Sequence, residues 1–241
     1  MSEEKEKDRT QESEGQAAPD LIRELGLLAS GNQFKSEFQY ISIIGCVEGH
    51  TVLTQENKTT KYEHLIPELI AVEENPDIKG LLLILNTVGG DVEAGLALAE
   101  LIAGISKPTV SLVIGGGHSI GIPLAVSADY GFVAKSATMT LHPIRTSGTV
   151  ITAEPTFAYM RKTQDRVVDF ILEHSRAERK VIEEKMNCTS NMANDVGTLL
   201  FGPEAVELGL MDEVGSLRQA LRKLRELAGI EKSSLDKNCK K

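Results

Sequence analysis

The chain has 241 residues, of which 41% are hydrophobic, and its formal net charge at pH 7 is −9. This length is sufficient for one sizeable hydrophobic core, or for a core with a small appendage. The acidic balance, without any basic patch, disfavours nucleic acid or an anionic membrane surface as the main partner.

The N-terminal 35 residues are rich in Glu, Lys, Ser and Gln and cannot bury enough apolar area to offset chain entropy. We therefore expect residues 1–35 to be a disordered acidic tail. Its start, MSEEKEKDRTQESEGQ, contains no apolar stretch of the kind found in a secretory signal. Three cysteines, Cys46, Cys188 and Cys239, show no paired or metal-ligand spacing. These features predict a cytoplasmic protein without a metal site.

A strand–helix alternation begins at Phe38. QYISIIG, residues 39–45, is predicted to be a strand, and the apolar spacing in residues 62–74 predicts a helix. GLLLILN, residues 80–86, is a near-continuous apolar run, which is typical of a strand covered on both faces. A turn then leads to a second helix over residues 92–105.

Residues 109–126, TVSLVIGGGHSIGIPLAV, form an apolar segment of nearly membrane-spanning length. Three consecutive glycines, a His and a Ser interrupt it, so we predict a strand, a tight turn and a short buried helix over residues 120–127. Short strands are expected over residues 130–134 and again in ATMTLHPI, where the strand ends at His142.

One long helix is predicted over residues 155–187, and a charged amphipathic helix over residues 216–230. Repeated strand–helix units predict a parallel, right-handed α/β layer structure. The expected organisation is a tail (1–35), one domain (36–215) and a C-terminal helix with its tail (216–241).

Ser119 lies in the sequence Gly-Gly-Gly-His-Ser-Ile-Gly, between the predicted strand and the short helix. Glycines permit positive φ and close backbone approach, so the hydroxyl can be held at the start of the helix. Negative charge that develops near a nucleophile is favoured at this position. The same pattern also fits a structural turn in which the serine caps the helix.

Two further motifs end neighbouring strands. Gly89 and Gly90 follow the apolar strand, at the end where α/β sheets collect ligands, and glycine-rich ends can direct N–H groups at one oxyanion. His142 ends a later strand, where a neutral imidazole can take the proton of a serine and return it to a leaving amine. Each motif alone also has a structural explanation.

Taken together, these motifs in residues 38–214 resemble the proteolytic subunit of Clp protease, and within that family the translocation-enhancing, TepA-like branch. The resemblance implies a ClpP/crotonase-like α/β fold of repeated β-β-α units with a protruding handle helix. It also implies a serine endopeptidase that hydrolyses unfolded polypeptides through an acyl-enzyme, inside a ring-shaped homo-oligomer. No cofactor is implied. The chain has no nucleotide-binding motif, so ATP use would belong to an AAA+ unfoldase partner.

Carried over by position, the resemblance implies that Ser119 is the nucleophile and His142 the general base. The backbone N–H groups of Gly90 and Ile120 would form the oxyanion hole. The family usually places an Asp shortly before its Pro-Glu-Ala segment, and Asp195 is the nearest carboxylate here.

This chain departs from the family pattern at several positions. Asp195 lies further from Pro203 than the pattern requires, and an ungapped match places Gly197 at the third position instead. Val88 replaces a common proline. His118 directly precedes the nucleophile, and we expect its side chain to be structural and to point away from the catalytic rim.

Two other functions remain open from the sequence. One is an acyl-CoA hydratase or isomerase of the crotonase fold, because that fold shares the glycine-rich oxyanion turns. The other is a catalytically inactive scaffold paralogue that joins a peptidase ring, which the irregular spacing of Asp195 suggests. Within the peptidase reading, Lys135 is an alternative base in a Ser–Lys dyad.

Overall fold

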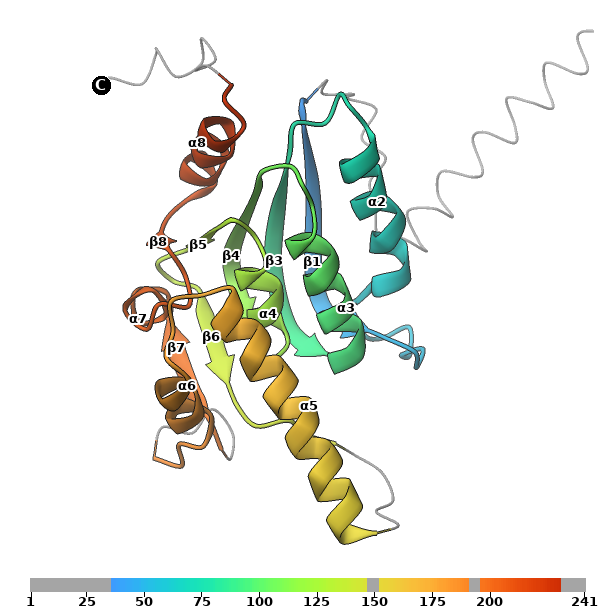
Figure 1. Ribbon diagram of the computed structural model, residues 1–241, viewed down its shortest axis with the longest axis vertical. Helices are drawn as coiled ribbons and strands as arrows, with labels where there is room; N and C mark the ends of the chain where they lie inside the picture. The colour runs from blue at the N-terminus through green and yellow to red at the C-terminus, as the bar shows by residue number, and fades with distance from the viewer. Residues whose placement is uncertain (1–35, 147–151, 191–195, 231–241) are drawn as a thin grey trace, which may run out of the picture. The chain divides into compact units, whose positions relative to one another are not determined.

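The structure is a computed structural model that describes residues 36–146, 152–190 and 196–230 (Figure 1). The predicted acidic tail, residues 1–35, lies outside these ranges, as does the segment from residue 231. The fold described below is that of the unit beginning at Glu37.

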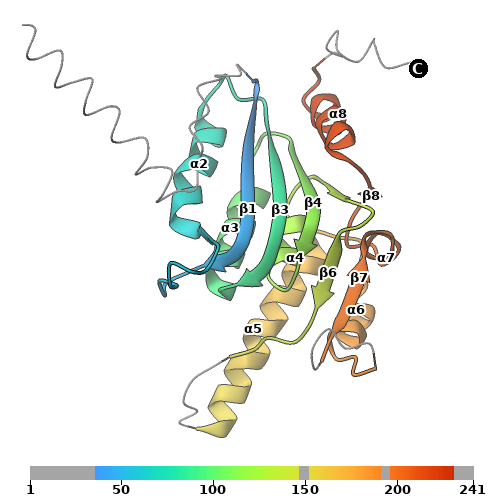
Figure 2. The ribbon, with the colours of Figure 1, turned by 180° about the vertical axis from the view of Figure 1, so that it is seen from behind.

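A parallel sheet with the strand order β2-β1-β3-β4-β5-β8 forms the framework. Figure 2 shows β1, β3 and β4 of this sheet side by side. Each neighbouring pair in this order is parallel, which confirms the predicted parallel α/β arrangement. The strands are β1 (Phe38–Glu48), β2 (Thr59–Lys61), β3 (Gly80–Gly90), β4 (Thr109–Gly117), β5 (Tyr130–Val133) and β8 (Glu213–Val214).

A smaller sheet branches from this framework. β6 (Thr138–Leu141) pairs in antiparallel register with β7 (Thr198–Phe201). β6 also meets β4 in parallel, where Gly116 lies opposite Thr138. Strand β4 therefore belongs to both sheets, and β6, which precedes His142, joins the large sheet only through it.

Helices cover both faces of the large sheet, unequally. Figure 1 shows α3, α4 and α5 on one face, and the main core lies beneath them and α2. α8 packs on strands β3 and β4 through a second, smaller cluster. The helices are α2 (Tyr62–Glu74), α3 (Val92–Ala103), α4 (Gly121–Val126), α5 (Ala153–Glu173), α6 (Arg179–Met186), α7 (Gly202–Glu207) and α8 (Leu217–Leu227).

Strand β3 shows why its sequence is an unbroken apolar run. Leu81 and Leu83 contribute to the main core, whereas Leu82 belongs to the cluster with Ala220 and Leu224 of α8. All of these side chains are buried. The prediction of a strand covered on both faces is confirmed.

Two strands extend further than their apolar runs suggest. β3 continues through the predicted turn to Gly90, because Val47 of β1 lies opposite this glycine and prolongs the ladder. β4 likewise continues to Gly117, which lies opposite Thr87. The glycine-rich segments are therefore strand ends, and residues 109–126 form a strand, a turn and a short helix as predicted.

The prediction of one long helix over residues 155–187 was wrong. α5 ends at Glu173 and α6 begins at Arg179. Between them, the backbone N–H of Arg176 donates to the carbonyl of Gly209 at 2.9 Å, and its guanidinium pairs with Asp212. These contacts tie the connection to the segment after α7, so the helix axis cannot continue.

No helix within the described ranges combines the length and apolar character that crossing a bilayer requires.

Candidate active site

The turn between β4 and α4 holds Ser119 in a strained conformation. Its φ is +57°, in the left-handed region that side chains other than glycine rarely occupy. Three hydrogen bonds fix the turn: the Ser119 N–H donates to the carbonyl of Thr140, that of Gly121 to His118, and that of Ile122 to Ser119, each at 2.9 Å. Strain of this kind persists only where the surroundings enforce it, and it is concentrated at functional sites.

The end of β3 lies directly against this serine. Gly89 has a φ of +91°, and a Cβ placed there would lie 2.7 Å from the Cβ of Ser119. Gly90 has a φ of +154°, and a Cβ there would lie 2.2 Å from the carbonyl oxygen of Val47. Glycine at position 89 therefore allows β3 to lie against the serine turn, and glycine at position 90 allows it to lie against β1.

His142 directly follows the last residue of β6, Leu141. Its Nδ1 lies 2.7 Å from the carbonyl oxygen of Pro143. A carbonyl only accepts hydrogen bonds, so this contact places the ring proton on Nδ1 and leaves Nε2 as an acceptor. That tautomer is the one a general base for a serine hydroxyl requires.

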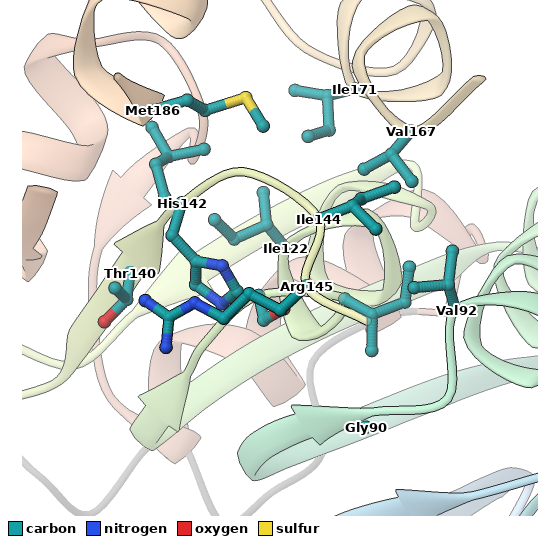
Figure 3. Close-up of a pocket in the computed structure, with 13 residues that line it drawn as sticks. Gly90, Val92, Ile122, Thr140, His142, Ile144, Arg145, Val167, Ile171 and Met186 are labelled. Atoms are coloured by element: carbon teal, nitrogen blue, oxygen red, sulfur yellow. The ribbon is translucent and has the colours of Figure 1, made fainter. Parts of the chain in front are cut away.

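One cavity of about 130 Å³ joins these elements (Figure 3). Ser119, His142, Gly90 and Ile120, which come from three separate strand ends, all line it. The structure therefore brings four of the predicted site residues to a single cavity. The fifth, Asp195, lies outside the described residues.

Much of the cavity wall is aliphatic. Figure 3 shows Val167 and Ile171 approaching from α5, and Met186 from α6, while Thr140 and His142 belong to the β6 side. The sequence analysis missed this wall because its members are dispersed along the chain. They are Val92, Ile122, Ile144, Val167, Ile171 and Met186.

The position that an ungapped family match assigns to the third catalytic residue is occupied by Gly197. Its φ is +126°, and a Cβ there would lie 2.4 Å from the carbonyl oxygen of Leu141 and 2.8 Å from the Cβ of His142. The backbone of Gly197 thus packs on His142 where no side chain fits. Position 197 itself cannot supply a carboxylate to the imidazole.

His118, whose side chain was expected to point away from the rim, is not among the residues that line the cavity. It is nevertheless close to the site, because its Nδ1 lies 2.7 Å from the hydroxyl oxygen of Thr140. Burial, and secondarily the proximity of His142, lower the pKa of His118. No sequence motif indicated this contact.

The alternative base, Lys135, is exposed and does not line the cavity. Across the described residues, no group of three or more His, Cys, Asp or Glu side chains is gathered closely enough to hold a metal ion.

Comparison with known proteins shows which family the chain belongs to. The family model for Clp protease matches residues 35–218. The chain is 50% identical over 218 residues to the translocation-enhancing protein TepA of Halalkalibacterium halodurans, covering 90% of this chain and 85% of that protein.

Two more distant relatives agree with that match. The chain is 30% identical over 141 residues to the ATP-dependent Clp protease proteolytic subunit 1 of Chlamydia muridarum, covering 56% of this chain and 69% of the relative. It is 26% identical over 210 residues to a putative protease of Methanocaldococcus jannaschii, covering 76% and 66% respectively. The resemblance inferred from the sequence motifs is confirmed, and the chain belongs to the Clp protease family.

Proposed function

We propose that the chain is a serine endopeptidase that works through an acyl-enzyme. The Ser119 hydroxyl attacks the scissile carbonyl while Nε2 of His142 takes its proton, and the carbonyl carbon becomes bonded to Oγ. His142 then returns the proton to the leaving amine, and the peptide C–N bond breaks. A water molecule, activated by the same imidazole, hydrolyses the ester and restores the serine.

The remaining roles follow from the same cavity. The N–H groups of Gly90 and Ile120 would stabilise the oxyanion of each tetrahedral intermediate. The Pro143 carbonyl would hold the His142 tautomer, with or without Asp195 as an additional partner. The observation that carries the proposal is the strained Ser119 on the same cavity as His142.

We propose further that catalysis takes place inside a ring of identical subunits that receives unfolded polypeptide from an AAA+ unfoldase. Membership of the Clp protease family supports this assembly. Exposed aromatic side chains near the start of α5, Phe157 and Tyr159, provide apolar area for contacts between subunits. Such a complex would serve protein quality control.

Labelling with a fluorophosphonate tests the chemistry. The purified protein should acquire one covalent phosphonyl adduct, which mass spectrometry of the digested protein should locate at Ser119. Ser119→Ala should abolish it, whereas Ser136→Ala, at an exposed serine in the loop before β6, should not. An unlabelled Ser119, under conditions that fully label a known serine peptidase, would refute the proposal.

One observation favours a second candidate, an inactive subunit that contributes structure to a peptidase ring. Gly197 fills the space beside His142, and the described partner of Nδ1 is a backbone carbonyl. For this candidate we expect normal assembly without labelling of Ser119. Casein hydrolysis that Ser119→Ala abolishes would exclude it.

A further inference from the structure

The two reacting side chains are attached to different strands that share little backbone pairing. Ser119 follows β4, and His142 follows β6. These strands meet in register at Gly116 and Thr138, close to the start of β6. Further along β6, other links must therefore determine the separation between the serine turn and His142.

Thr140 of β6 provides such links to two residues of the turn, Ser119 and His118. Its carbonyl accepts the hydrogen bond from the Ser119 N–H at 2.9 Å. Its hydroxyl lies 2.7 Å from Nδ1 of His118. The second contact involves a side chain that the proposed reaction does not use.

The imidazole of His118 spans the junction between β4 and β6. It lies over Gly116, where an added Cβ would be 2.7 Å from both Cδ2 and Nε2 of the ring. The backbone N–H of His118 donates to the carbonyl of Thr87 at 3.2 Å, which attaches the same residue to the end of β3. His118 is thus held on one side by the large sheet and on the other by β6.

The charge state of His118 suits a position beside the general base. Burial, and secondarily the neighbouring His142, lower the pKa of His118, which favours the neutral form of the ring. A neutral ring does not oppose the positive charge that His142 acquires when it takes the serine proton.

We propose that the His118–Thr140 hydrogen bond is a positioning link, which holds the nucleophile turn against β6 and keeps Ser119 within reach of His142. This inference rests on the proposed hydrolytic function. In this role each residue acts through the serine turn and not on the substrate, so both are positioning residues. The link requires a hydroxyl at position 140 and a hydrogen-bonding side chain at position 118.

Variants of matched shape test the link. Thr140→Val and His118→Phe remove one partner each, whereas Thr140→Ser and His118→Asn retain hydrogen-bonding groups. Thr109→Val is the control, because it removes a buried hydroxyl that bonds Asp129 at the opposite end of β4. Each protein is studied as the full chain, by the rate of fluorophosphonate labelling and by hydrogen–deuterium exchange of the peptide containing Ser119.

We expect Thr140→Val and His118→Phe each to slow labelling roughly two- to tenfold and to speed exchange of the Ser119 peptide by a similar factor. The double variant should be no slower than the worse single variant, because both substitutions break the same bond. Thr140→Ser and His118→Asn should restore labelling, and Thr109→Val should leave it unchanged.

Labelling of Thr140→Val at the wild-type rate, or independent effects that multiply in the double variant, would overturn the link. An unlabelled wild-type protein would instead refute the hydrolytic function. In that case hydrogen–deuterium exchange alone tests the positioning link. Faster exchange of the Ser119 peptide in Thr140→Val supports the link, and unchanged exchange overturns it.

Discussion

Ser119 occupies a backbone conformation that only glycine adopts without strain, and the φ of +57° is enforced by hydrogen bonds from its neighbours. Ser119→Gly and Ser119→Ala both remove the nucleophile, but only glycine relieves the strain. We expect Ser119→Gly to be about 1 kcal/mol more stable than Ser119→Ala. Chemical denaturation of the two variants measures this difference, and equal midpoints would show that the turn stores no strain.

At the scale of single residues, the sequence predicted site geometry where a residue type has one main structural role, as glycine has in close backbone contacts. The glycines around Ser119 and at the end of β3 predicted close approach, and the structure places Ser119, Gly90, Ile120 and His142 on one cavity. The His118–Thr140 contact was not predictable, because it depends on the register of β6 against the turn. No local pattern encodes that register.

Gly197, directly before β7, shows how one element constrains another. A Cβ at this position would meet Leu141 and His142, whereas a Cβ at Gly229, which follows α8 with a φ of +64°, would meet nothing within 4 Å. Gly229→Ala therefore measures only the cost of placing alanine at a positive φ, and we expect it to reduce the free energy of unfolding by about 1 kcal/mol. Gly197→Ala also forces the new methyl group against Leu141 and His142, so it should reduce the free energy of unfolding by about 3 kcal/mol.

The same variant should also disturb His142. We expect Gly197→Ala to slow fluorophosphonate labelling, and Gly229→Ala to leave it at the wild-type rate. Thermal melting and labelling of both proteins test this pair. A Gly197→Ala protein as stable as Gly229→Ala would contradict the close packing of Gly197 on Leu141 and His142.

The end of α2 is joined to the connection after α3 by a carboxylate. Glu73 accepts hydrogen bonds from the N–H of Ser106 at 2.9 Å and from its hydroxyl at 2.8 Å. These bonds, with a smaller contribution from Lys107, lower the pKa of Glu73. Because the folded pKa lies below the unfolded one, the stabilisation is present at neutral pH and is lost as acidification titrates the folded carboxyl.

Glu73→Gln should therefore reduce the dependence of stability on pH below about pH 4.5, near the ordinary pKa of a glutamate. Urea denaturation between pH 3 and pH 7 measures this dependence. Glu74→Gln, at the adjacent exposed residue, is the control. If both variants follow the wild-type curve, Glu73 makes no specific contribution.

For the whole molecule, the strand–helix alternation was sufficient to predict the fold class. Continuous apolar runs indicate buried strands, and amphipathic segments indicate helices that cover the sheet. The short strand β7 was not predicted. β7 has four residues and is stabilised by its antiparallel pairing with β6, which pairs Thr138 with Phe201. The break between α5 and α6 likewise depends on contacts from Arg176 to a distant segment.

The start of α5 carries Phe157 and Tyr159, whose side chains are 62% and 64% exposed. If they mediate contacts between subunits, Phe157→Ser combined with Tyr159→Ser should yield a smaller particle with an unchanged circular dichroism spectrum. Analytical ultracentrifugation measures the particle mass. Val52→Ser, which alters an exposed loop residue, is the control, and an unchanged mass in the double variant would exclude this surface.

The pairing of β6 with β7 has a consequence for biosynthesis. During translation, the serine turn and β6 are synthesised well before residues 198–201. These residues form β7, the antiparallel partner of β6. A nascent chain therefore lacks part of the framework around His142 until translation has passed Phe201. If Ser119 and His142 carry out the proposed hydrolysis, a nascent chain would therefore gain this activity only after residues 198–201 have been added.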